Sequence, residues 1–306
     1  MTNQFKVFGG TSHPALVSDI CHILRLQQAS SFTKEFSNEN LLVRIDEDVR
    51  GYDCFVIQTA SPPLHTNMME LFILCDTLRA YGAKSICAVM PYFPYIRSDK
   101  QDKPGVGIVA RLVADLVETS GATSAILLDL HSRQAQGFFK IPTRVVSAAK
   151  VLTAYLKTLD LSNAVLVAPD AGEVKDLVPY TEMLSLPMAI IDKRRYDDNE
   201  HAHAYGIVGD IVGKTAILID DEIATGGTIC ESAMILKSKG ADKIIVLCTH
   251  PVFSGHAIER LEAAPIEQVI VTDSLPLRMQ SNKITSLSIA PVLADAILAQ
   301  FPSHSE

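Results

Sequence analysis

Short apolar runs recur along the whole chain, separated by segments with regularly spaced polar positions. The runs are rich in valine, isoleucine and leucine and have almost no internal polar residues. Because strands of a parallel sheet are buried on both faces, such runs predict these strands. The runs are residues 6–8, 41–45, 54–57, 86–90, 125–128, 164–168, 188–191, 216–219, 244–248 and 268–271.

The segments between the runs have helical periodicity. Residues 68–81 end before Gly82, a typical helix C-cap, and their expected buried face is Met69, Phe72, Ile73 and Leu78. Residues 108–119 have apolar positions at i, i+3 and i+4, which are Val109, Leu112, Val113, Leu116 and Val117. Further helices are expected over 148–159 and 229–239. Strands that alternate with helices in this way predict an α/β fold.

Polar side chains follow three of the predicted strands at the point where each strand ends. Asp129 and His131 follow the run 125–128, and Asp170 follows the run 164–168. Asp220 and Asp221 follow the run 216–219. In open parallel sheets, ligands bind beyond the carboxyl ends of the strands. We therefore expect these loops to line a ligand site.

The segment 216–228 has the most informative pattern. Its strand ends in two acids, and a helix then starts at Thr225, Gly226, Gly227 and Thr228. The N–H groups of a glycine turn at a helix N-terminus form a pocket for an anion. Carboxylates just upstream suit sugar hydroxyls or a metal ion. The pattern thus favours a phosphorylated sugar; the alternative is an acidic turn followed by an ordinary threonine N-cap.

Length and charge limit the function classes. The 306 residues predict two domains, and 27 basic against 35 acidic residues give a net charge of −8. This balance argues against a protein that coats nucleic acid. No apolar stretch is long enough for a transmembrane helix, and the first residues do not form a secretory signal. Six cysteines without a CxxC pair are typical of reduced, buried thiols in a cytoplasmic protein.

The segment 216–228 resembles the loop for phosphoribosyl pyrophosphate shared by type I phosphoribosyltransferases and ribose-phosphate pyrophosphokinases. Other stretches resemble the second family alone, and they cover essentially the whole chain in order. They are residues 36–38, 68–72, 91–100, 129–139, 169–172, 192–195 and 248–250. The chain is therefore identified as a member of the pyrophosphokinase family. This resemblance implies two phosphoribosyltransferase-like domains, each with a mainly parallel sheet flanked by helices.

The resemblance also implies an activity and an organisation. The β,γ-diphosphoryl group of ATP would pass to the anomeric hydroxyl of ribose 5-phosphate, with Mg²⁺ as cofactor, giving phosphoribosyl pyrophosphate and AMP. An N-terminal domain, 1–145, would bind ATP, with a helix at 290–302 packing back on it. A second domain, 146–289, would bind ribose 5-phosphate. The family is built from dimers, so a homo-oligomer, expected to be a hexamer, with ATP contacts across the dimer interface is implied.

The resemblance also implies which residues contact ATP. The expected residues are Phe36, Asn38, Asn40, Arg97, Asp99 and His131. Arg97 is suited to bind phosphate with two parallel hydrogen bonds. His131 and Asp170 are the expected metal contacts, and Asp170 is the more natural one because Mg²⁺ prefers oxygen ligands. From the residues alone, Phe36 could equally be a core side chain and His131 a structural one.

The expected sugar-phosphate contacts lie in the C-terminal half. They are Asp170, Asp220, Asp221, Thr225, Gly226, Gly227 and Thr228. Lys193 and Arg195 belong to the chain's only run of three basic residues, and the resemblance makes them catalytic cations. We expect them on a loop that follows the strand 188–191 and closes over the phosphoryl groups. The alternative is a solvated basic turn.

The chain departs from the family pattern at several positions. Ala224 replaces an acid, Glu173 replaces a glycine and Asn40 replaces a glutamate. The loop 101–109 lacks the usual arginine and serine, and Arg133 replaces a small residue. These changes imply weaker or altered activation by phosphate and inhibition by ADP. They also fit an alternative, a non-catalytic regulatory subunit, whereas a phosphoribosyltransferase would leave residues such as Phe36 and Lys193 without a role.

Overall fold

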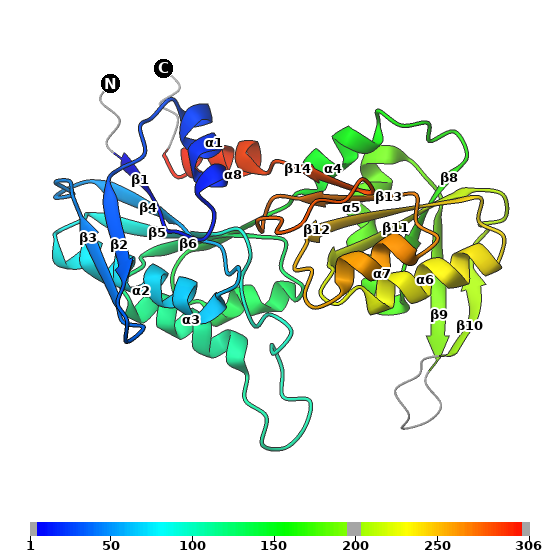
Figure 1. Ribbon diagram of the computed structural model, residues 1–306, viewed down its shortest axis with the longest axis horizontal. Coiled ribbons are helices and arrows are strands. Elements are labelled where there is room, and N and C mark those ends of the chain that lie inside the picture. Colours follow the sequence, from blue (N-terminus) through cyan, green and yellow to red (C-terminus); the bar gives the residue numbers. More distant parts are fainter. Residues whose placement is uncertain (1–4, 195–202, 302–306) are drawn as a thin grey trace. The chain divides into compact units, whose positions relative to one another are not determined.

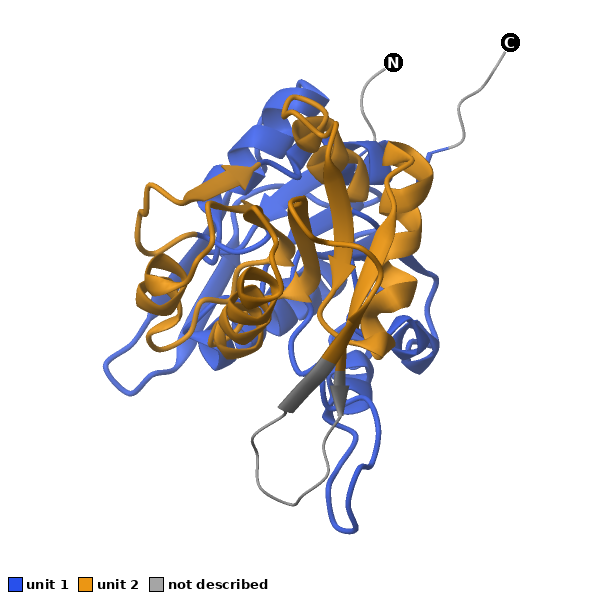
Figure 2. Ribbon diagram, turned by 90° about the vertical axis from the view of Figure 1, so that its right-hand side faces the viewer, with its two compact units in different colours: residues 1–147, 274–276, 288–306 blue, residues 148–273, 277–287 orange. Residues whose placement is uncertain are grey.

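The computed structural model describes residues 5–194 and 203–301, and the side chains of 193–194 and 203–205 are outside the description. The chain forms two compact units (Figure 2). Unit 1 contains the described residues up to 147 together with 274–276 and 288–301. Unit 2 contains the described residues of 148–273 together with 277–287.

Unit 1 is built on a five-stranded parallel sheet in the order β1-β4-β5-β6-β7. Its strands are Phe5–Gly9, Asp53–Ile57, Ser85–Met90, Ser124–Leu128 and Thr143–Val146. Helices α1 (Pro14–Leu24) and α8 (Ala290–Leu298) lie on one side of this sheet, and α2 (Leu64–Ala80) and α3 (Val109–Thr119) lie on the other (Figure 1). Both faces of the central strands are thus covered, as their apolar sequences predict.

The late part of the chain closes unit 1. Helix α8 packs against α1, and the ring of Phe301 stacks on Phe5 with centroids 4.9 Å apart. Phe301 also meets Phe55 edge-on at 6.0 Å. The hydroxyl of Thr59 donates a hydrogen bond of 2.6 Å to the carbonyl of Ser274. Segments more than 200 residues apart therefore share one core.

The strand expected at 41–45 is present, but it is not a doubly covered parallel strand. It is β3 (Leu41–Ile45), which pairs with β2 (Ser31–Glu35) in an antiparallel hairpin. Val43 and Ile45 are buried in the core that includes α2, whereas Phe32 and Leu42 point to the exposed face. The expectation was wrong because a hairpin that packs on one helix has only one covered face.

Two helices bury most of the expected face but turn some of its large residues outward. Helix α2 starts at Leu64 and turns Met69 outward, since its buried apolar residues are Met68, Leu71, Leu74, Cys75 and Leu78. Helix α3 buries Val113 and Val117 as expected but exposes Leu112 and Leu116. Ala110 and Ala114 pack inward in their place. Close packing against the sheet selects these small residues over the larger leucines.

Unit 2 is built on a seven-stranded sheet in the order β10-β9-β8-β11-β12-β13-β14. Only β10 and β9 pair antiparallel. In chain order the strands are β8 Ala164–Ala168, β9 Met188–Arg194, β10 His203–Val208, β11 Thr215–Glu222, β12 Lys243–His250, β13 Gln268–Thr272 and β14 Ile284–Leu287. The predicted α/β class is therefore confirmed in both units.

Four helices cover the sheet of unit 2. Helices α6 (Gly227–Ser238) and α7 (Ala257–Ala263) contact each other and pack on one face, and α4 (Ala149–Leu156) and α5 (Val174–Leu184) lie on the other (Figure 1). Two short 3₁₀ helices, η1 (Arg133–Phe138) in unit 1 and η2 (Ala171–Glu173) in unit 2, follow strand ends. Helices α6 and α7 position the site described below.

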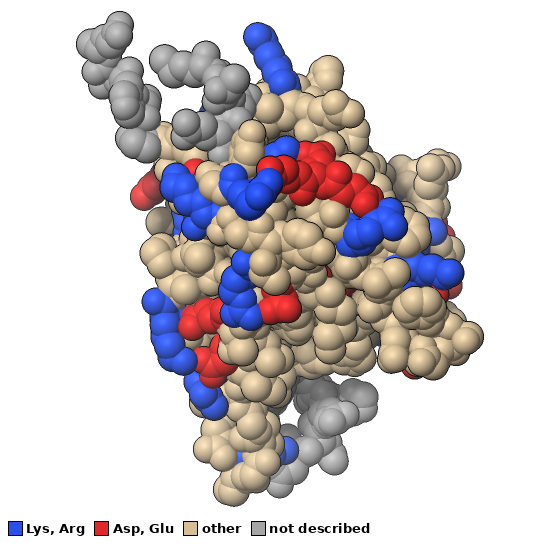
Figure 3. All heavy atoms as spheres, turned by 90° about the vertical axis from the view of Figure 1, so that its left-hand side faces the viewer, with Lys and Arg blue, Asp and Glu red and all other residues tan. Residues whose placement is uncertain are grey.

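Charged side chains of both signs are interspersed on the face of the molecule in Figure 3. In unit 1 they form surface ion pairs, such as Lys84 with Asp53 at 3.0 Å and Arg50 with Asp48 at 2.7 Å. A continuous basic surface of the kind that binds nucleic acid is not formed on this face. Within the described parts of the chain, no helix is both long and apolar enough to cross a membrane.

Candidate active site

The carboxyl end of β11 leads directly into the start of α6. Gly226 is the N-cap residue of α6 and has a φ of +75°, a left-handed conformation that favours glycine. The first helical hydrogen bond runs from the N–H of Cys230 to the carbonyl of Gly226, at 2.9 Å. Thr225, Gly227 and Thr228 are exposed around this point. The loop therefore presents hydroxyl groups and the first N–H groups of a three-turn helix on its surface.

Asp220 and Asp221 end the same strand. Asp220 lies opposite Cys248 of β12 in the parallel register. Its burial raises its pKa well above the ordinary value, and the carboxylates of Asp221 and Glu173 raise it further. The ionised form of such a carboxyl is disfavoured unless a cation or hydrogen-bond donors compensate its charge. A ligand that brings either would therefore bind this pair of acids favourably.

Asp170 lies at the same edge of the sheet. It follows β8, which pairs in parallel with β11, so the loops after both strands emerge together. Its Oδ1 accepts a hydrogen bond of 2.7 Å from the N–H of Gly172 and caps η2. Glu173 ends η2, and its charge contributes to the rise in the pKa of Asp220. The structure thus brings Asp170, Asp220 and Asp221 to one edge.

Of the two expected catalytic cations, the structure describes only the backbone of Lys193. Lys193 lies inside β9, with its backbone paired to Ala204 of β10, and not on a loop after the strand. The expected loop position was wrong because the strand extends three residues beyond its apolar run. Arg195 lies outside the described residues. β9 is the neighbour of β8 on the side away from β11.

In unit 1, the expected phosphate contacts follow two neighbouring strands. Arg97 and Asp99 lie in the connection after β5, and His131 lies after β6. This connection is tied to its surroundings, because the N–H of Ser98 bonds to Tyr95 and the N–H of Ala110 in α3 bonds to Ser98. Arg97 is exposed, while Asp99 and His131 are half-buried. The three residues therefore come to the same edge of the sheet of unit 1.

The hairpin tip carries the other three expected ATP contacts. Phe36 is 44% exposed, so it is not a core residue. The ammonium group of Lys34 lies 5.5 Å from the centroid of the Phe36 ring. Asn38 and Asn40 shape the turn, since the N–H of Asn40 donates to the side chain of Asn38 at 3.3 Å. An exposed aromatic face on a projecting turn is available to a planar ligand.

Two family models match the chain. The N-terminal domain of ribose phosphate pyrophosphokinase matches residues 5–121, and the phosphoribosyl synthetase-associated domain matches residues 203–305. A ribose-phosphate pyrophosphokinase from Wolinella succinogenes is 40% identical over 301 residues, covering 98% of this chain and 97% of the relative. The chain belongs to the ribose-phosphate pyrophosphokinase family. The family resemblance found in the sequence is thus confirmed.

Further members of the ribose-phosphate pyrophosphokinase family are similar to this chain over nearly its full length. The enzyme of that name from Aquifex aeolicus is 42% identical, and the match covers 96% of this chain and 95% of that relative. The crystal structure of phosphoribosylpyrophosphate synthetase from Mycobacterium smegmatis has a TM-score of 0.91 and 38% identity, over 97% of this chain and 98% of that one. The two-domain, phosphoribosyltransferase-like fold expected from the sequence is confirmed.

A ribose-phosphate pyrophosphokinase uses ATP, and the phosphates of such a substrate usually bind together with Mg²⁺. The described residues contain no group of three or more histidine, cysteine or acidic side chains arranged around one point. Mg²⁺ usually takes one or two carboxylates and completes its shell with water and substrate phosphates. Asp170 fits that requirement, since only its Oδ1 is used by Gly172. His131 offers a nitrogen, which Mg²⁺ accepts less readily.

The positions that depart from the family pattern are mostly on the surface. The loop after β5 is exposed from Lys100 to Gly107, and its Lys100 and Asp102 form an ion pair of 3.7 Å. Arg133 is exposed at the start of η1, which directly follows the His131 motif. Ala224 and Glu173 lie at the edge of the unit 2 sheet beside Asp220.

One polar network at the edge of the unit 1 sheet was missed from the sequence. Oε2 of the buried Glu70 accepts hydrogen bonds from the N–H (2.9 Å) and hydroxyl (2.7 Å) of Thr11 and from Gln58 (2.7 Å). Gln58 in turn accepts from the N–H of Ser12 at 3.2 Å. A side chain at Gly10 would place Cβ 2.2 Å from Gln58. A glutamate among the apolar positions of a helix, and glycines after a strand, were the available signals.

Proposed function

We propose that this chain is an active ribose-phosphate pyrophosphokinase, which transfers the β,γ-diphosphoryl group of ATP to ribose 5-phosphate. The observation that carries the proposal is the end of β11, where two acids and a glycine turn at a helix N-terminus lie together. Acids for hydroxyl groups and N–H donors for a phosphate are the recognition chemistry of a phosphorylated sugar. The full-length similarity to members of the family supports the same reaction.

The reaction makes one bond and breaks one. The anomeric oxygen of ribose 5-phosphate attacks the β-phosphorus of ATP and loses its proton. The bond between the β-phosphorus and the oxygen that bridges it to the α-phosphorus breaks, and AMP leaves with that electron pair. Such transfers depend mainly on positioning and on neutralising the charge of the phosphoryl oxygens.

Unit 2 would hold the sugar phosphate. In this proposal Asp220 and Asp221 accept hydrogen bonds from the ribose hydroxyls. The 5-phosphate binds the N–H groups and hydroxyls at the start of α6, that is Thr225, Gly226, Gly227 and Thr228. Asp170, from the neighbouring strand, contributes an oxygen near the ribose. The site fits a ligand with an anionic group at one end and hydroxyl groups at the other.

Unit 1 would hold ATP. The guanidinium group of Arg97 binds a phosphate, and Asp99 and His131 lie beside it at the same sheet edge. The hairpin tip supplies the adenine contacts, with Phe36 stacking on the base and Asn38 and Asn40 binding its edge. In a dimer-based assembly, expected to be a hexamer, this exposed tip would serve the ATP site of a second copy of the chain.

Lys193 and Arg195 would neutralise negative charge that develops during transfer. Their effect is then larger in the transition state than in the bound substrates. Asp170 and His131 are the candidate ligands of Mg²⁺, which would add positive charge beside the phosphates. The acids at the edge of the unit 2 sheet would repel the triphosphate of ATP if their charge were not compensated. Positive charge from this chain and from the metal ion is therefore needed.

One assay tests the proposal. Purified protein is incubated with ribose 5-phosphate, ATP and Mg²⁺, and AMP and phosphoribosyl pyrophosphate are quantified. Equal amounts of both products are expected. Failure to form AMP over a range of phosphate and metal concentrations would contradict the proposal and favour the non-catalytic subunit. Product formation only from phosphoribosyl pyrophosphate and a nucleobase would favour a phosphoribosyltransferase.

A further inference from the structure

The sugar-phosphate loop is supported from behind by a second segment of unit 2. The carbonyl of Ile223 accepts a hydrogen bond from the N–H of Phe253 at 3.0 Å, and the carbonyl of Ala224 accepts one from Ser254 at 2.8 Å. The next carbonyl, of Thr225, accepts a bond of 3.1 Å from a guanidinium nitrogen of Arg260 in α7. Three consecutive carbonyls of the loop are therefore fixed on one side.

This support determines where the N–H groups of the loop point. In a trans peptide the N–H lies opposite the preceding C=O. With the carbonyls of residues 223–225 turned toward the supporting segment, the N–H groups of Ala224, Thr225 and Gly226 point away from it. These N–H groups donate no hydrogen bond to any of the described residues. Successive free N–H groups on one side of a loop form a concave anion site.

The supporting helix is itself held at both ends. A Cβ at Gly226 would lie 3.4 Å from the carbonyl oxygen of Ala257, so the loop sits directly against the start of α7. At the other end, the ammonium group of Lys283 donates to the carbonyls of Glu262 at 2.6 Å and Ala264 at 3.1 Å. This contact completes the hydrogen bonding of the helix C-terminus. Arg260 thus projects from a fixed element.

We propose that Arg260 is a positioning residue of the sugar-phosphate site: it holds the peptide between Thr225 and Gly226 so that its N–H faces the phosphate. The inference rests on the proposed function of this loop. Thr225 directly precedes the N-cap residue of α6, and no backbone donor among the described residues bonds to its carbonyl. Without Arg260 this peptide can rotate, which removes one N–H from the anion site.

The charge of Arg260 acts on the same region. It opposes the rise in pKa that burial causes at Cys230, which lies in the first turn of α6. The neighbouring acid of the same helix, Glu259, is paired with His256 at 3.5 Å instead. The guanidinium charge therefore adds to the positive potential at the start of α6 and favours an anion there.

The test compares Arg260→Ala and Arg260→Lys with the wild type in steady-state assays. Arg260→Ala is expected to raise the KM for ribose 5-phosphate about tenfold, the effect of losing one charge-assisted hydrogen bond. The KM for ATP should stay within about twofold, since the loop does not bind ATP. Arg260→Lys keeps a charged donor and should recover most of the loss. Lys243→Ala, at the opposite end of β12 and paired with Glu267, is the control and should change neither constant.

Hydrogen exchange of the loop provides a second measurement. In Arg260→Ala the amides of Phe253 and Ser254, which donate to the loop carbonyls, should exchange faster while those of β8 and β12 keep their rates. An unchanged KM for ribose 5-phosphate, or an equal rise in the KM for ATP, would overturn the inference. If the wild type makes no AMP, the proposed function fails, and calorimetric binding of ribose 5-phosphate to the wild type and Arg260→Ala then decides the inference alone.

Discussion

At the residue scale, the roles proposed for single side chains separate into binding and catalysis. In the proposed reaction Asp220 binds the sugar, whereas Lys193 acts on charge that develops during transfer. Lys193→Ala should therefore lower kcat at least about 100-fold with little change in the KM for ribose 5-phosphate. Asp220→Ala should instead raise that KM.

The control for this pair is Lys214→Ala. Lys214 precedes β11, at the opposite end of the strand from the site, and pairs with Asp210 at 3.0 Å. The Lys214→Ala variant removes a lysine from the same unit without changing the proposed site. Equal losses of kcat in Lys193→Ala and Lys214→Ala would contradict the catalytic role, because a general loss of charge would then explain both.

The buried thiols give a stability prediction with a defined sign. Burial raises the pKa of Cys75 to about 12 and that of Cys87 to about 11. Unfolding returns these pKa values to about 8.5, so above that pH the unfolded chain loses protons that the folded protein keeps. The free energy of unfolding should be fully retained below pH 8.5. Above it, each thiol should lower that energy by up to about 1.4 kcal/mol per pH unit.

Urea denaturation at pH 8 and pH 10 measures this effect. Other groups also titrate in that range, so the comparison is with Cys75→Ala. The variant is expected to be less stable at pH 8, because a buried atom is lost, but its stability should fall less between the two pH values. An identical fall in both proteins would show that Cys75 does not contribute.

Local sequence predicted the position of most proposed contacts but not their support. Acids that follow apolar runs identified Asp170, Asp220 and Asp221 at one edge, because parallel strands share that edge. The hydrogen bond from Arg260 to Thr225 spans 35 residues, and its formation depends on how α7 packs. No local pattern contains that information. The exposure of Phe36 likewise depends on which face of the hairpin packs on α2.

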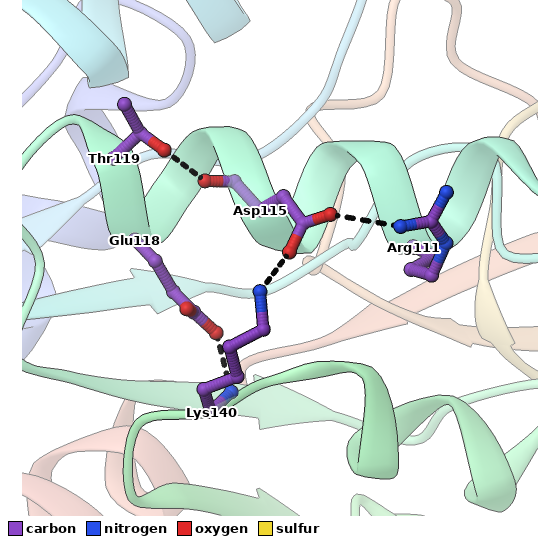
Figure 4. A network of polar contacts seen from close by, with 5 residues as sticks. All are labelled: Arg111, Asp115, Glu118, Thr119 and Lys140. Atoms are coloured by element: carbon purple, nitrogen blue, oxygen red, sulfur yellow. Dashed lines mark hydrogen bonds and ion pairs between the residues drawn. The ribbon is translucent and has the colours of Figure 1, made fainter.

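At the scale of elements, burial decides how much a carboxylate stabilises its surroundings. Glu70 is buried and joins α2 to the turn between β1 and α1 through two hydrogen bonds accepted from Thr11, and it accepts a third from Gln58 after β4. Asp115 of α3 is on the surface, where it accepts bonds from Arg111 at 3.2 Å and Lys140 at 2.8 Å (Figure 4). The backbone N–H of Lys140 also bonds to Glu118.

Replacing each carboxylate by alanine should separate the two cases. Glu70→Ala leaves buried donors without partners and should lower the free energy of unfolding by about 3 kcal/mol. Asp115→Ala removes only surface ion pairs, which water and salt screen, so it should not measurably change stability. Chemical denaturation at low salt measures both. A larger loss in Asp115→Ala than in Glu70→Ala would contradict this assignment.

The predicted elements were reliable where a strand or helix has two covered faces and less so elsewhere. The central strands of both sheets were found, since their apolar runs are continuous. The peripheral strands β2, β7, β10 and β14 were missed because they have few consecutive apolar residues. In α3 the large leucines face outward, so counting bulky apolar residues selected part of the wrong face.

At the scale of the whole molecule, unit 1 depends on the last helix of the chain. Leu293 in α8 is fully buried, whereas Leu298 on the same helix is 48% exposed. Leu293→Ala should lower the free energy of unfolding by about 3 kcal/mol and speed hydrogen exchange in α1 and β1. Leu298→Ala is the matched control and should have little effect. Faster exchange mainly in α4 and α5 would instead assign α8 to the stability of unit 2.

Regulation is also a property that is tested on the whole protein. The exposed loop 100–107 and Arg133 differ from the family pattern, and we expect weaker or altered activation by inorganic phosphate. Activity measured with and without phosphate, and with added ADP, tests this expectation. A strict requirement for phosphate would show that other residues replace the missing arginine and serine.

The return of the chain to unit 1 after unit 2 has a consequence for biosynthesis. A ribosome releases the chain from its N-terminus, and domains generally fold as units during synthesis. The sheet of unit 1 is complete once β7 has emerged, but α8 and Phe301, which cover α1, Phe5 and Phe55, are translated only after unit 2. Apolar surface on the nascent unit 1 therefore stays uncovered while all of unit 2 is made. This interval is where chaperones would act and where slow translation would expose the chain to aggregation.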